Sequence, residues 1–298
     1  MKSVLKPLKE ESKTEHVLYI SYGKDSLACL GAIEELGLPL DRIVHAEVWA
    51  TDTIHADFPE MVEFKAKADK IIKERYGIEV EHFRADVTYE EQFYKKRFNK
   101  KLNADCIYGF PIIKGAWCND SLKMGALRKC KTNGIEYIGI AFDEPNRFHC
   151  LNDKKRSPLV EAEWTEEMCR KWCEENNLLS PIYTQSARGG CWFCHNQGVE
   201  QLRLLRSKYP EYWWLLLRWD KDSPVYFKPD GHTVHDFDKR FAMEEMGFVP
   251  ADRKFRWSML NQCDSCWWYG KPIDCPADFD IDTKICKNFK NKETDEKK

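Results

Sequence analysis

Residues 16–26 read HVLYISYGKDS, and this stretch decides the fold. Its first part, 16–21, is a short apolar run of the length of a buried strand. A polar turn that contains Gly23 comes next. Beyond the turn, apolar residues recur at helical spacing up to Gly37: Leu27, Leu30, Ile33 and Leu36. The stretch is therefore predicted to be a strand, a turn and an amphipathic helix.

The same alternation continues through the first half of the chain. Further strands are predicted at 42–50, 78–85 and 135–142, and a long helix at 58–76 that ends at Gly77. Strands that alternate with helices favour a parallel sheet covered by helices on both faces. We therefore expect an α/β fold built on an open, mostly parallel, doubly wound sheet.

The second half differs in composition. Seven of the eleven tryptophans and six of the thirteen cysteines follow residue 190. Helices are predicted at 161–177 with Thr165 as the N-cap, at 198–219 with an interruption near Pro210, and around 237–246. We predict one domain over residues 1–160 and a helical, Cys- and Trp-rich C-terminal region over residues 161–298.

Composition limits the classes of function. The 298 residues are 43% hydrophobic and 32% charged, which is typical of a folded globular chain. A net charge of −2 excludes a globally basic nucleic-acid binder. No apolar run approaches the roughly 18 residues of a membrane span, and the first residues lack a signal-peptide core. We expect a cytoplasmic protein, not bound to membranes, whose cysteines are thiols available for metal or redox chemistry.

The turn Ser21–Ser26 (SYGKDS) suits a phosphate group. Ligands of open parallel sheets bind at the carboxyl ends of strands, where the next helix presents amide groups to an anion. Gly23 permits close approach of the backbone, the serines offer hydroxyls, and Lys24 adds a positive charge. The turn is not a Walker A loop, since position 18 is not Gly and position 25 is not Ser or Thr. A G-x-G-x-x-G dinucleotide loop is also excluded, because positions 21 and 26 are both Ser.

The SYGKDS turn resembles the SGGKDS loop of PP-loop ATP pyrophosphatases, and residues 16–197 resemble their phosphoadenylylsulfate (PAPS) reductase-like branch. Further segments match that branch in its order: Asp52-Thr53 with Phe58-Pro59-Glu60, Trp117-Cys118 with Leu122-Lys123, Gly139-Ile140 with Asp143-Glu144 and Arg147, Ser157-Pro158-Leu159, Trp164-Thr165-Glu166-Glu167, Ser180-Pro181-Ile182-Tyr183, and Gly190-Cys191-x-x-Cys194. The sequence departs from the branch at Tyr22, which replaces a Gly, and at Ala141, which replaces an Arg. It also lacks an ECGIH-like segment, where sulfonucleotide reductases keep their catalytic cysteine.

The resemblance implies an adenine nucleotide alpha-hydrolase-like fold and a site for ATP, or for a sulfonucleotide, with Mg²⁺. The residues that it assigns to the nucleotide are Ser21, Gly23, Lys24, Asp25, Ser26, Asp52, Thr53 and Arg147. Lys24, Asp25 and Cys118 are the catalytic candidates. Mg²⁺ prefers one or two carboxylates together with phosphate oxygens, which favours Asp52 as a metal-facing residue. Asp52 is otherwise a turn residue, and Arg147 an ordinary surface residue.

A first cysteine site is predicted around Cys191 and Cys194. Their C-x-x-C spacing, in the glycine-rich segment RGGCWFCH, supplies two thiolates to a zinc or iron–sulfur site. The resemblance adds Cys118 as a third ligand or a redox thiol. The fourth ligand is open among Cys106, Cys130 and His195, and the first two of these are alternatively small buried hydrophobic residues.

A second cysteine site is predicted near the end of the sequence. Four cysteines lie there within 24 residues: Cys263, Cys266, Cys275 and Cys286. They can close a zinc or iron–sulfur site, or pack as plain thiols among tryptophans, and the two sites could exchange members. Cys169 and Cys173 lie four apart on a predicted helix, where core packing is the better interpretation.

These features lead to one leading function and two alternatives. The leading function is a PAPS reductase-like PP-loop enzyme that adenylylates a substrate with release of pyrophosphate, for sulfur transfer or redox modification of a nucleic acid or small molecule. A thiol or sulfur-donor protein is an expected partner. The basic runs Lys95–Arg97 with Lys100–Lys101, and Lys154–Arg156, are solvated faces or a local patch for tRNA or DNA. The alternatives are a sulfonucleotide reductase and an inactive nucleotide-sensing or nucleic-acid-binding partner protein.

Overall fold

A computed structural model describes residues 14–99, 104–112, 116–184 and 190–261. The chain divides into two compact units, each made of two chain segments. Unit 1 comprises Met1–Thr88 and Asn119–Gly190, and unit 2 comprises Tyr89–Cys118 and Cys191–Lys298. The boundary expected at residue 160 therefore falls inside unit 1, and residues 89–118, expected in the first domain, belong to unit 2.

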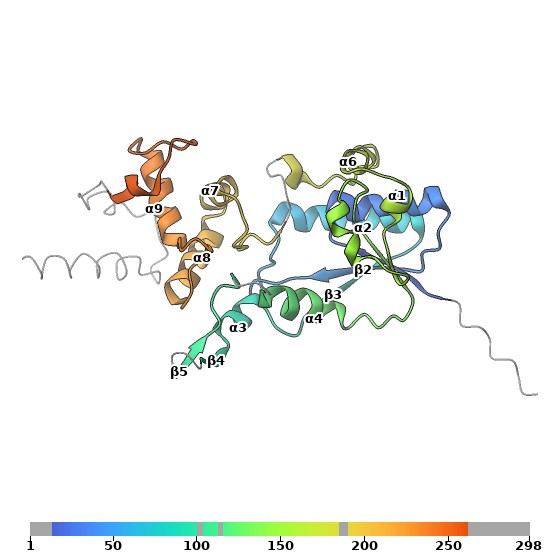
Figure 1. The fold of residues 1–298 in the computed structure, drawn as a ribbon, viewed down its shortest axis with the longest axis horizontal. Helices are drawn as coiled ribbons and strands as arrows, with labels where there is room; N and C mark the ends of the chain where they lie inside the picture. Colours follow the sequence, from blue (N-terminus) through green and yellow to red (C-terminus); the bar gives the residue numbers. More distant parts are fainter. Residues whose placement is uncertain (1–13, 100–103, 113–115, 185–189, 262–298) are drawn as a thin grey trace, which may run out of the picture. The chain divides into compact units, whose positions relative to one another are not determined.

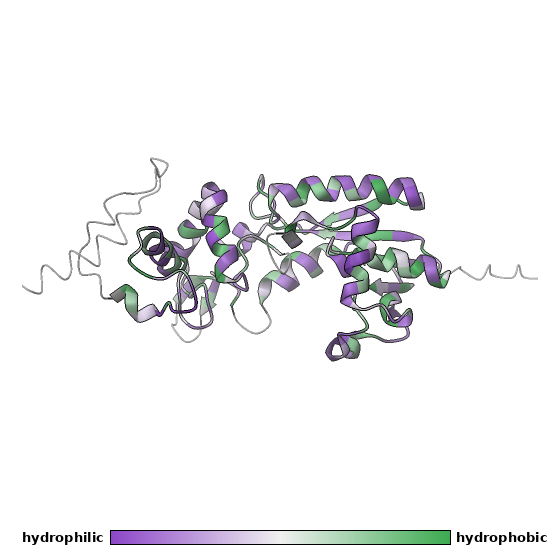
Figure 2. Ribbon diagram, turned by 90° about the horizontal axis from the view of Figure 1, so that it is seen from above, coloured by the Kyte–Doolittle hydropathy of each residue, from purple (hydrophilic) through white to green (hydrophobic). Residues whose placement is uncertain are grey.

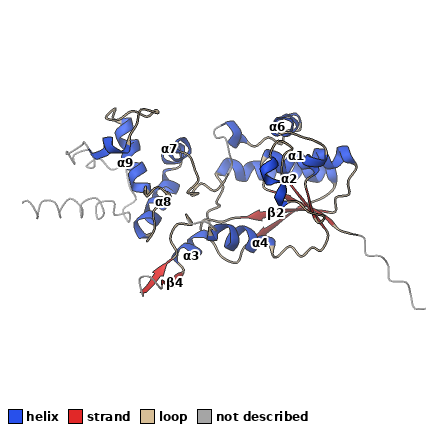
Figure 3. Ribbon diagram, viewed as in Figure 1, coloured by secondary structure: helices blue, strands red, loops and turns tan. Residues whose placement is uncertain are grey.

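Unit 1 is built on a five-stranded parallel sheet (Figure 1, Figure 3). Its strands are β1 (His16–Ile20), β2 (Arg42–Glu47), β3 (Val80–Arg84), β6 (Ile135–Ile138) and β7 (Lys155–Arg156). The order across the sheet is β3-β2-β1-β6-β7, and every neighbouring pair is parallel. The chain turns back between β1 and β6, so their carboxyl ends flank the place where open α/β sheets bind ligands. The predicted open parallel sheet is confirmed.

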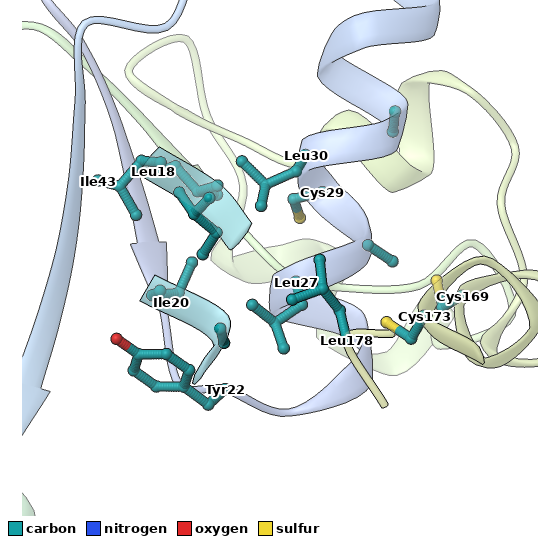
Figure 4. Close-up of a cluster of buried hydrophobic side chains, with 14 of the residues drawn as sticks. Leu18, Ile20, Tyr22, Leu27, Cys29, Leu30, Ile43, Cys169, Cys173 and Leu178 are labelled. Carbon is teal, nitrogen blue, oxygen red and sulfur yellow. The ribbon is translucent and has the colours of Figure 1, made fainter. Parts of the chain in front are cut away.

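Helices cover both faces of this sheet. The elements on one face are α1 (Lys24–Leu36), α2 (Pro59–Tyr76), α5 (Pro158–Glu161) and α6 (Glu166–Glu175), and those on the other are the π-helix η1 (Asn119–Met124) and α4 (Gly125–Leu127). Alternate residues of β1 pack into the apolar clusters on the two faces of the sheet, because successive side chains of a strand point to opposite faces. Leu18 and Ile20 belong to the core that contains Leu27, Leu30 and Cys173 (Figure 4). Val17 and Tyr19 pack on the other face with Cys130 and Leu127. The sheet is thus doubly wound.

The helix ends follow from local sequence signals. Helix α2 has Pro59 in its first turn and ends at Gly77, whose φ of 69° is left-handed. Helix α6 begins after Thr165, whose hydroxyl accepts from the Met168 amide at 3.4 Å, as predicted. Figure 2 shows polar and apolar residues alternating along the helices. Cys169 and Cys173 are fully buried in the core, which confirms the packing interpretation, and burial raises the pKa of each thiol to about 12.

Unit 2 joins a short helix and a hairpin to a helical region. Its elements are α3 (Tyr89–Tyr94), β4 (Lys96–Asn99), β5 (Ala104–Ile107), α7 (Val199–Lys208), α8 (Pro210–Asp222), α9 (Val234–Glu245) and the 3-10 helix η4 (Trp257–Asn261). The helix predicted at 198–219 is divided at Pro210, because proline has no amide to donate inside a helix. The Trp219 indole donates to Glu90 at 3.0 Å, which links the two segments of the unit. None of the helices among the described residues is long and apolar enough to cross a membrane.

Candidate functional site

The Ser21–Ser26 loop joins β1 to α1 at the turning point of the sheet and is closed by its own hydrogen bonds. The Ser21 amide donates to the Ser26 hydroxyl at 3.0 Å, and that hydroxyl donates to the Gly23 carbonyl at 2.9 Å. The two serine hydroxyl oxygens lie 3.2 Å apart. Gly23 precedes α1 in an extended conformation, with φ −78° and ψ 155°. The loop is therefore a preformed polar turn at the N-terminus of a helix of 13 residues.

Lys24 is held at both its amide and its ammonium group. The amide donates to the hydroxyl oxygen of Tyr183, from the 3-10 helix η3 (Pro181–Thr184), at 3.0 Å. The ammonium pairs with Asp25 and with Glu166 of α6, both at 2.7 Å. Burial opposes the charge, but the two carboxylates outweigh it and the pKa of Lys24 is raised. Burial also raises the pKa of Asp25, although Lys24 acts in the opposite direction.

Gly139, the residue that follows β6, lies directly against the loop. A Cβ at Gly139 would lie 2.7 Å from the Ser26 amide nitrogen and 2.8 Å from the Ser26 Cα. Only glycine permits this close approach of two backbones. The first turn of α1 is therefore held directly against the carboxyl end of β6.

The predicted residue Arg147 lies in the segment that follows β6. It is in the 3-10 helix η2 (Pro145–Cys150) and pairs with Glu144 at 2.8 Å. Glu144 also accepts from the Ala141 amide at 3.2 Å. Asp143 accepts from the Glu166 amide at 3.0 Å, which ties this segment to the start of α6. Arg147 is thus an exposed residue whose described partner is a carboxylate of its own segment.

Tyr22 adopts a left-handed conformation, with φ 57°. Its ring is fully buried, so this Tyr, at a position where the SGGKDS loop has Gly, packs into the core. The hydroxyl donates to Asp69 of α2 and lies 3.2 Å from the His82 Nε2 of β3. Asp69 and Glu47 together raise the pKa of His82 to about 9. Tyr22 therefore anchors the loop to two elements outside it.

A second buried polar group supports the end of β1. The His45 Nδ1 lies 2.9 Å from the Ile20 carbonyl oxygen, and its Nε2 lies 2.9 Å from the Lys65 ammonium. Lys65 also pairs with Asp57 at 2.5 Å. Burial lowers the pKa of His45 to about 3, so the ring is neutral near pH 7. It therefore donates to Ile20 and accepts from Lys65.

The predicted residues Asp52 and Thr53 lie on the loop after β2, at the same sheet edge as the Ser21–Ser26 loop. The Asp52 side chain is 83% exposed and pairs with Arg84 of β3 at 3.4 Å. The Thr53 amide donates to the Thr51 hydroxyl at 3.3 Å. A role of Asp52 with Mg²⁺ stays a prediction.

In unit 2, residues next to Cys118, Cys191 and Cys194 pack on one side chain, Tyr89. Tyr89 is 1% exposed, and its pKa is raised first by burial and then by these three thiols. Phe193, between the two cysteines of the C-x-x-C motif, packs on the Tyr89 ring with 4.0 Å between centroids. Trp117, next to Cys118, packs on the same ring with 5.0 Å between centroids, and a site shared by Cys118 and the C-x-x-C pair stays a prediction.

The C-x-x-C motif forms a tight turn. The Cys194 amide donates to the Cys191 carbonyl at 3.0 Å, and the Gln197 side-chain amide donates to the same oxygen at 2.9 Å. The half-buried Lys228 ammonium donates to the carbonyls of His195 and Gln197, both at 2.5 Å. Positive charge is thus held against the turn that carries Cys194.

Two observations bear on what this site could hold. Among the described residues, the buried Tyr89 Oη and Gln197 Oε1 have no hydrogen-bond partner, although buried polar atoms nearly always have one. The described side chains include no group of three or more His, Cys, Asp or Glu placed to hold a single metal ion. A lone zinc needs its sulfurs at about 2.3 Å, whereas an iron–sulfur cluster takes each cysteine on a different iron. Zinc or an iron–sulfur cluster on these cysteines therefore stays a prediction.

The remaining predicted cysteines lie in different places. Cys130 is buried in the core of unit 1, where the Tyr19 hydroxyl lies 3.9 Å from its sulfur. Cys106 is on β5 of unit 2, opposite Arg97. All nine described cysteines are thiols. The second predicted site, Cys263, Cys266, Cys275 and Cys286, lies outside the described residues, as does the pair Lys100–Lys101.

The strand order and the site define the class of protein: an open α/β fold with a phosphate-type loop at its turning point. No protein-family model matches the chain, and no curated protein matches it. Among solved structures it is similar to the U34-tRNA thiolase NcsA from Methanococcus maripaludis with its 4Fe–4S cluster. That similarity has 12% identity over 76% of this chain and 80% of the other, with a TM-score of 0.34. Because so low a TM-score supports no inference, function is argued below from this chain alone.

Sequence reasoning missed two residues of the loop site. Glu166 and Tyr183 both lie in segments that match the family's order, and neither was assigned to the nucleotide. A matched motif indicates that a segment is present, but it does not indicate which of its side chains contacts the loop. The Glu166 carboxylate and the Tyr183 hydroxyl accept hydrogen bonds from the same Lys24 donors from which a phosphate oxygen would accept.

Proposed function

We propose that unit 1 binds ATP through the Ser21–Ser26 loop and adenylylates a substrate with release of pyrophosphate. The observation that carries the proposal is the place of the loop, between the carboxyl ends of β1 and β6 with Gly139 against its helix. Ligand sites of open α/β sheets lie at this point, and helix N-termini favour anions. The resemblance to PP-loop ATP pyrophosphatases supplies the reaction.

The loop residues have separate roles in this proposal. A phosphate replaces Glu166 at the Lys24 ammonium and Tyr183 at the Lys24 amide, since it accepts from both donors. A substrate oxygen attacks the α-phosphorus, the bond to the bridging oxygen breaks, and pyrophosphate leaves with that electron pair. Lys24 and the amides of α1 stabilise the charge that develops on the leaving group. Mg²⁺ on the phosphate oxygens would neutralise further charge, with Asp52 as its candidate carboxylate.

We further propose an iron–sulfur cluster on Cys118, Cys191 and Cys194 of unit 2. Its support is the C-x-x-C motif together with the packing of Trp117, next to Cys118, and of Phe193, next to Cys194, on the ring of Tyr89. Such a cluster supplies sulfur-transfer or electron-transfer chemistry, which fits a PAPS reductase-like enzyme that modifies a nucleic acid or a small molecule. The exposed Lys95 and Lys96, beside Arg97 of β4, form the described part of one basic run that a nucleic acid would contact.

The test of the nucleotide site is the Lys24→Ala variant of the full chain. Loss of a charge-assisted hydrogen bond costs about 1.5–3 kcal/mol, so we expect roughly 10- to 100-fold weaker ATP binding by calorimetry. Formation of AMP and pyrophosphate should fall with it. The matched control is Lys67→Ala, an exposed lysine of α2. If Lys24→Ala and the unchanged chain bind ATP with equal affinity, the loop is not part of the nucleotide site.

A further inference from the structure

Lys65 is a charged side chain buried in unit 1. It lies on the buried face of α2 with Met61, Phe64, Ala68 and Ile72, and its side chain is 9% exposed. Burial of an ammonium group costs free energy unless ion pairs and hydrogen bonds offset it. A methionine of similar length would fill the same space without that cost. The lysine therefore has a role other than packing.

The Lys65 ammonium stands in the middle of a chain of three hydrogen bonds. It donates to the Asp57 carboxylate at 2.5 Å and to the His45 Nε2 at 2.9 Å. An ammonium can only donate, so Nε2 accepts and the proton of the ring is on Nδ1. Nδ1 donates to the Ile20 carbonyl oxygen at 2.9 Å. Asp57, Lys65, His45 and Ile20 thus form one continuous connection, the Lys65 bridge.

The two ends of the Lys65 bridge lie beside the predicted nucleotide residues. Ile20 is the last residue of β1, directly before the Ser21–Ser26 loop. Asp57 lies at the end of the loop after β2, the loop that carries Asp52 and Thr53. Strands β1 and β2 are parallel neighbours, so both loops leave the same edge of the sheet. The bridge therefore joins the two loops beneath the edge where ligands of such sheets bind.

The bridge also contacts the Ser21–Ser26 loop through Tyr22. The His45 ring meets the Tyr22 ring edge-on, with 4.8 Å between centroids, and the Lys65 ammonium lies 5.3 Å from the centroid of the same ring. Both distances are within the range of attractive ring contacts. The middle of the bridge thus holds the residue before the loop and the second residue of the loop.

We propose that Lys65 is a positioning residue of the nucleotide site, which through His45 and Asp57 fixes the Ser21–Ser26 loop and the loop after β2 relative to each other. The inference rests on the ATP site of the proposed function. A nucleotide that contacts both loops needs their donors and carboxylates at one separation, and a misplacement of about 1 Å can cost roughly 100-fold. Lys65 contributes by holding the loops and not by contact with the ligand.

The first experiment measures amide hydrogen exchange of the full chain without nucleotide. The double variant His45→Phe with Lys65→Met replaces the polar middle of the bridge by apolar side chains of similar size. Exchange should become faster in peptides that cover residues 20–26 and 51–57, and it should stay the same in β6, which carries no residue of the bridge. Lys67→Met is the matched control, an exposed lysine of the same helix, and both loops should exchange as in the unchanged chain.

Urea denaturation separates positioning from packing. Apolar replacement of buried ionic groups is often neutral or stabilising, and the Asp57 side chain, 20% exposed, remains in contact with water. The double variant should therefore be at least as stable as the unchanged chain although its two loops exchange faster. Lys65→Met alone, which keeps the His45 ring, should loosen the same loops and serves if the double variant does not fold. Lower stability with faster exchange throughout unit 1 would overturn the proposal, because Lys65 would then act by packing.

The second experiment titrates ATP with Mg²⁺ into the same chains by calorimetry. The double variant should bind roughly 10- to 100-fold more weakly, and Lys67→Met should bind as the unchanged chain does. An unchanged chain that binds no ATP would overturn the proposed function, and the exchange data would still show whether the bridge couples the two loops. An unchanged chain that binds ATP, with equal affinity in the double variant or with equal exchange of its loops, would overturn the role of Lys65 alone.

Discussion

In unit 1 the amide and the ammonium of Lys24 both have protein partners, whereas in unit 2 the buried Tyr89 Oη and Gln197 Oε1 have none among the described residues. The difference indicates two kinds of ligand. Donors held by Tyr183 and a carboxylate can exchange those partners for a ligand that arrives and leaves. Buried polar atoms without partners are costly whenever the site is bare, so they suit a group that stays bound.

The sharpest test of this contrast is removal of one cysteine sulfur from unit 2. Cys194→Ser should reduce iron and sulfide to background, because a serine oxygen is a harder and weaker ligand for iron–sulfur clusters than a thiolate. Cys150→Ser is the control, because Cys150 is an exposed thiol of η2 that belongs to neither predicted cysteine site, and this variant should keep its iron. ATP affinity should persist in Cys194→Ser, since the loop belongs to unit 1. If the two variants contain equal amounts of iron, Cys194 is not a ligand of the cluster.

The second largest effect is expected where β6 touches the loop. Gly139→Ala places a methyl group against the Ser26 backbone, which must move, so we expect a loss of about 1–3 kcal/mol in stability and weaker ATP binding. Gly125→Ala is the control, because its nearest atom is 3.5 Å away and alanine favours the helix. Urea denaturation and calorimetry measure both quantities. The idea of close backbone contact fails if Gly139→Ala is as stable as Gly125→Ala.

A smaller effect, of opposite sign, tests whether Glu166 competes with the ligand. Glu166→Gln weakens a half-exposed ion pair of about 0.2–1 kcal/mol, so ATP should bind roughly 1.4- to 5-fold more tightly. Glu167→Gln removes the same charge from the same first turn of α6 and should change the affinity less. Tighter binding in both variants, to the same extent, would mean that net charge and not exchange at Lys24 is responsible.

An effect that depends on pH concerns the anchor of Tyr22. His82 has a pKa of about 9 in the folded chain and about 6.5 in the unfolded chain, so its contribution to stability is complete below pH 6.5 and is lost as pH rises through 9. The melting temperature of His82→Asn should therefore fall furthest below that of the unchanged protein near pH 6, and equal it by pH 10. His149→Asn, on the exposed 3-10 helix η2, is the control. A deficit that is constant with pH would show that His82 acts by packing and not by charge.

The strands, the loop and the main helices of unit 1 could be predicted because their signals are local. A short apolar run, a helical period and a terminal glycine are each visible within about 20 residues, as at β1, α1 and Gly37. The anchoring of Tyr22 was not visible in this way. Its partners Asp69 and His82 lie 47 and 60 positions further on, and only the folded sheet brings them to the loop.

The division of the chain into units escaped sequence analysis for the same reason. Residues 89–118 have no composition that separates them from their neighbours. They belong to unit 2 through contacts such as Phe93 with Trp219, at 6.0 Å between centroids, and Tyr94 with Asp222. These contacts depend on three-dimensional packing across more than a hundred positions. A site shared by Cys118, Cys191 and Cys194 stays a prediction, and the structure adds that Trp117 and Phe193, next to these cysteines, both pack on Tyr89.

The two-segment construction of unit 2 has a consequence for the order of events during synthesis. Cys118 leaves the ribosome 73 residues ahead of Cys191, because the 72 residues of Asn119–Gly190 lie between them. At roughly 5–20 residues per second, that interval lasts about 4–15 s. Throughout it, β6 and β7 emerge and can complete the sheet, while the first segment of unit 2 has no second segment to pack against. The proposed cluster would therefore be loaded only after the sheet strands have emerged, so the Ser21–Ser26 loop can form before the second segment of unit 2 exists.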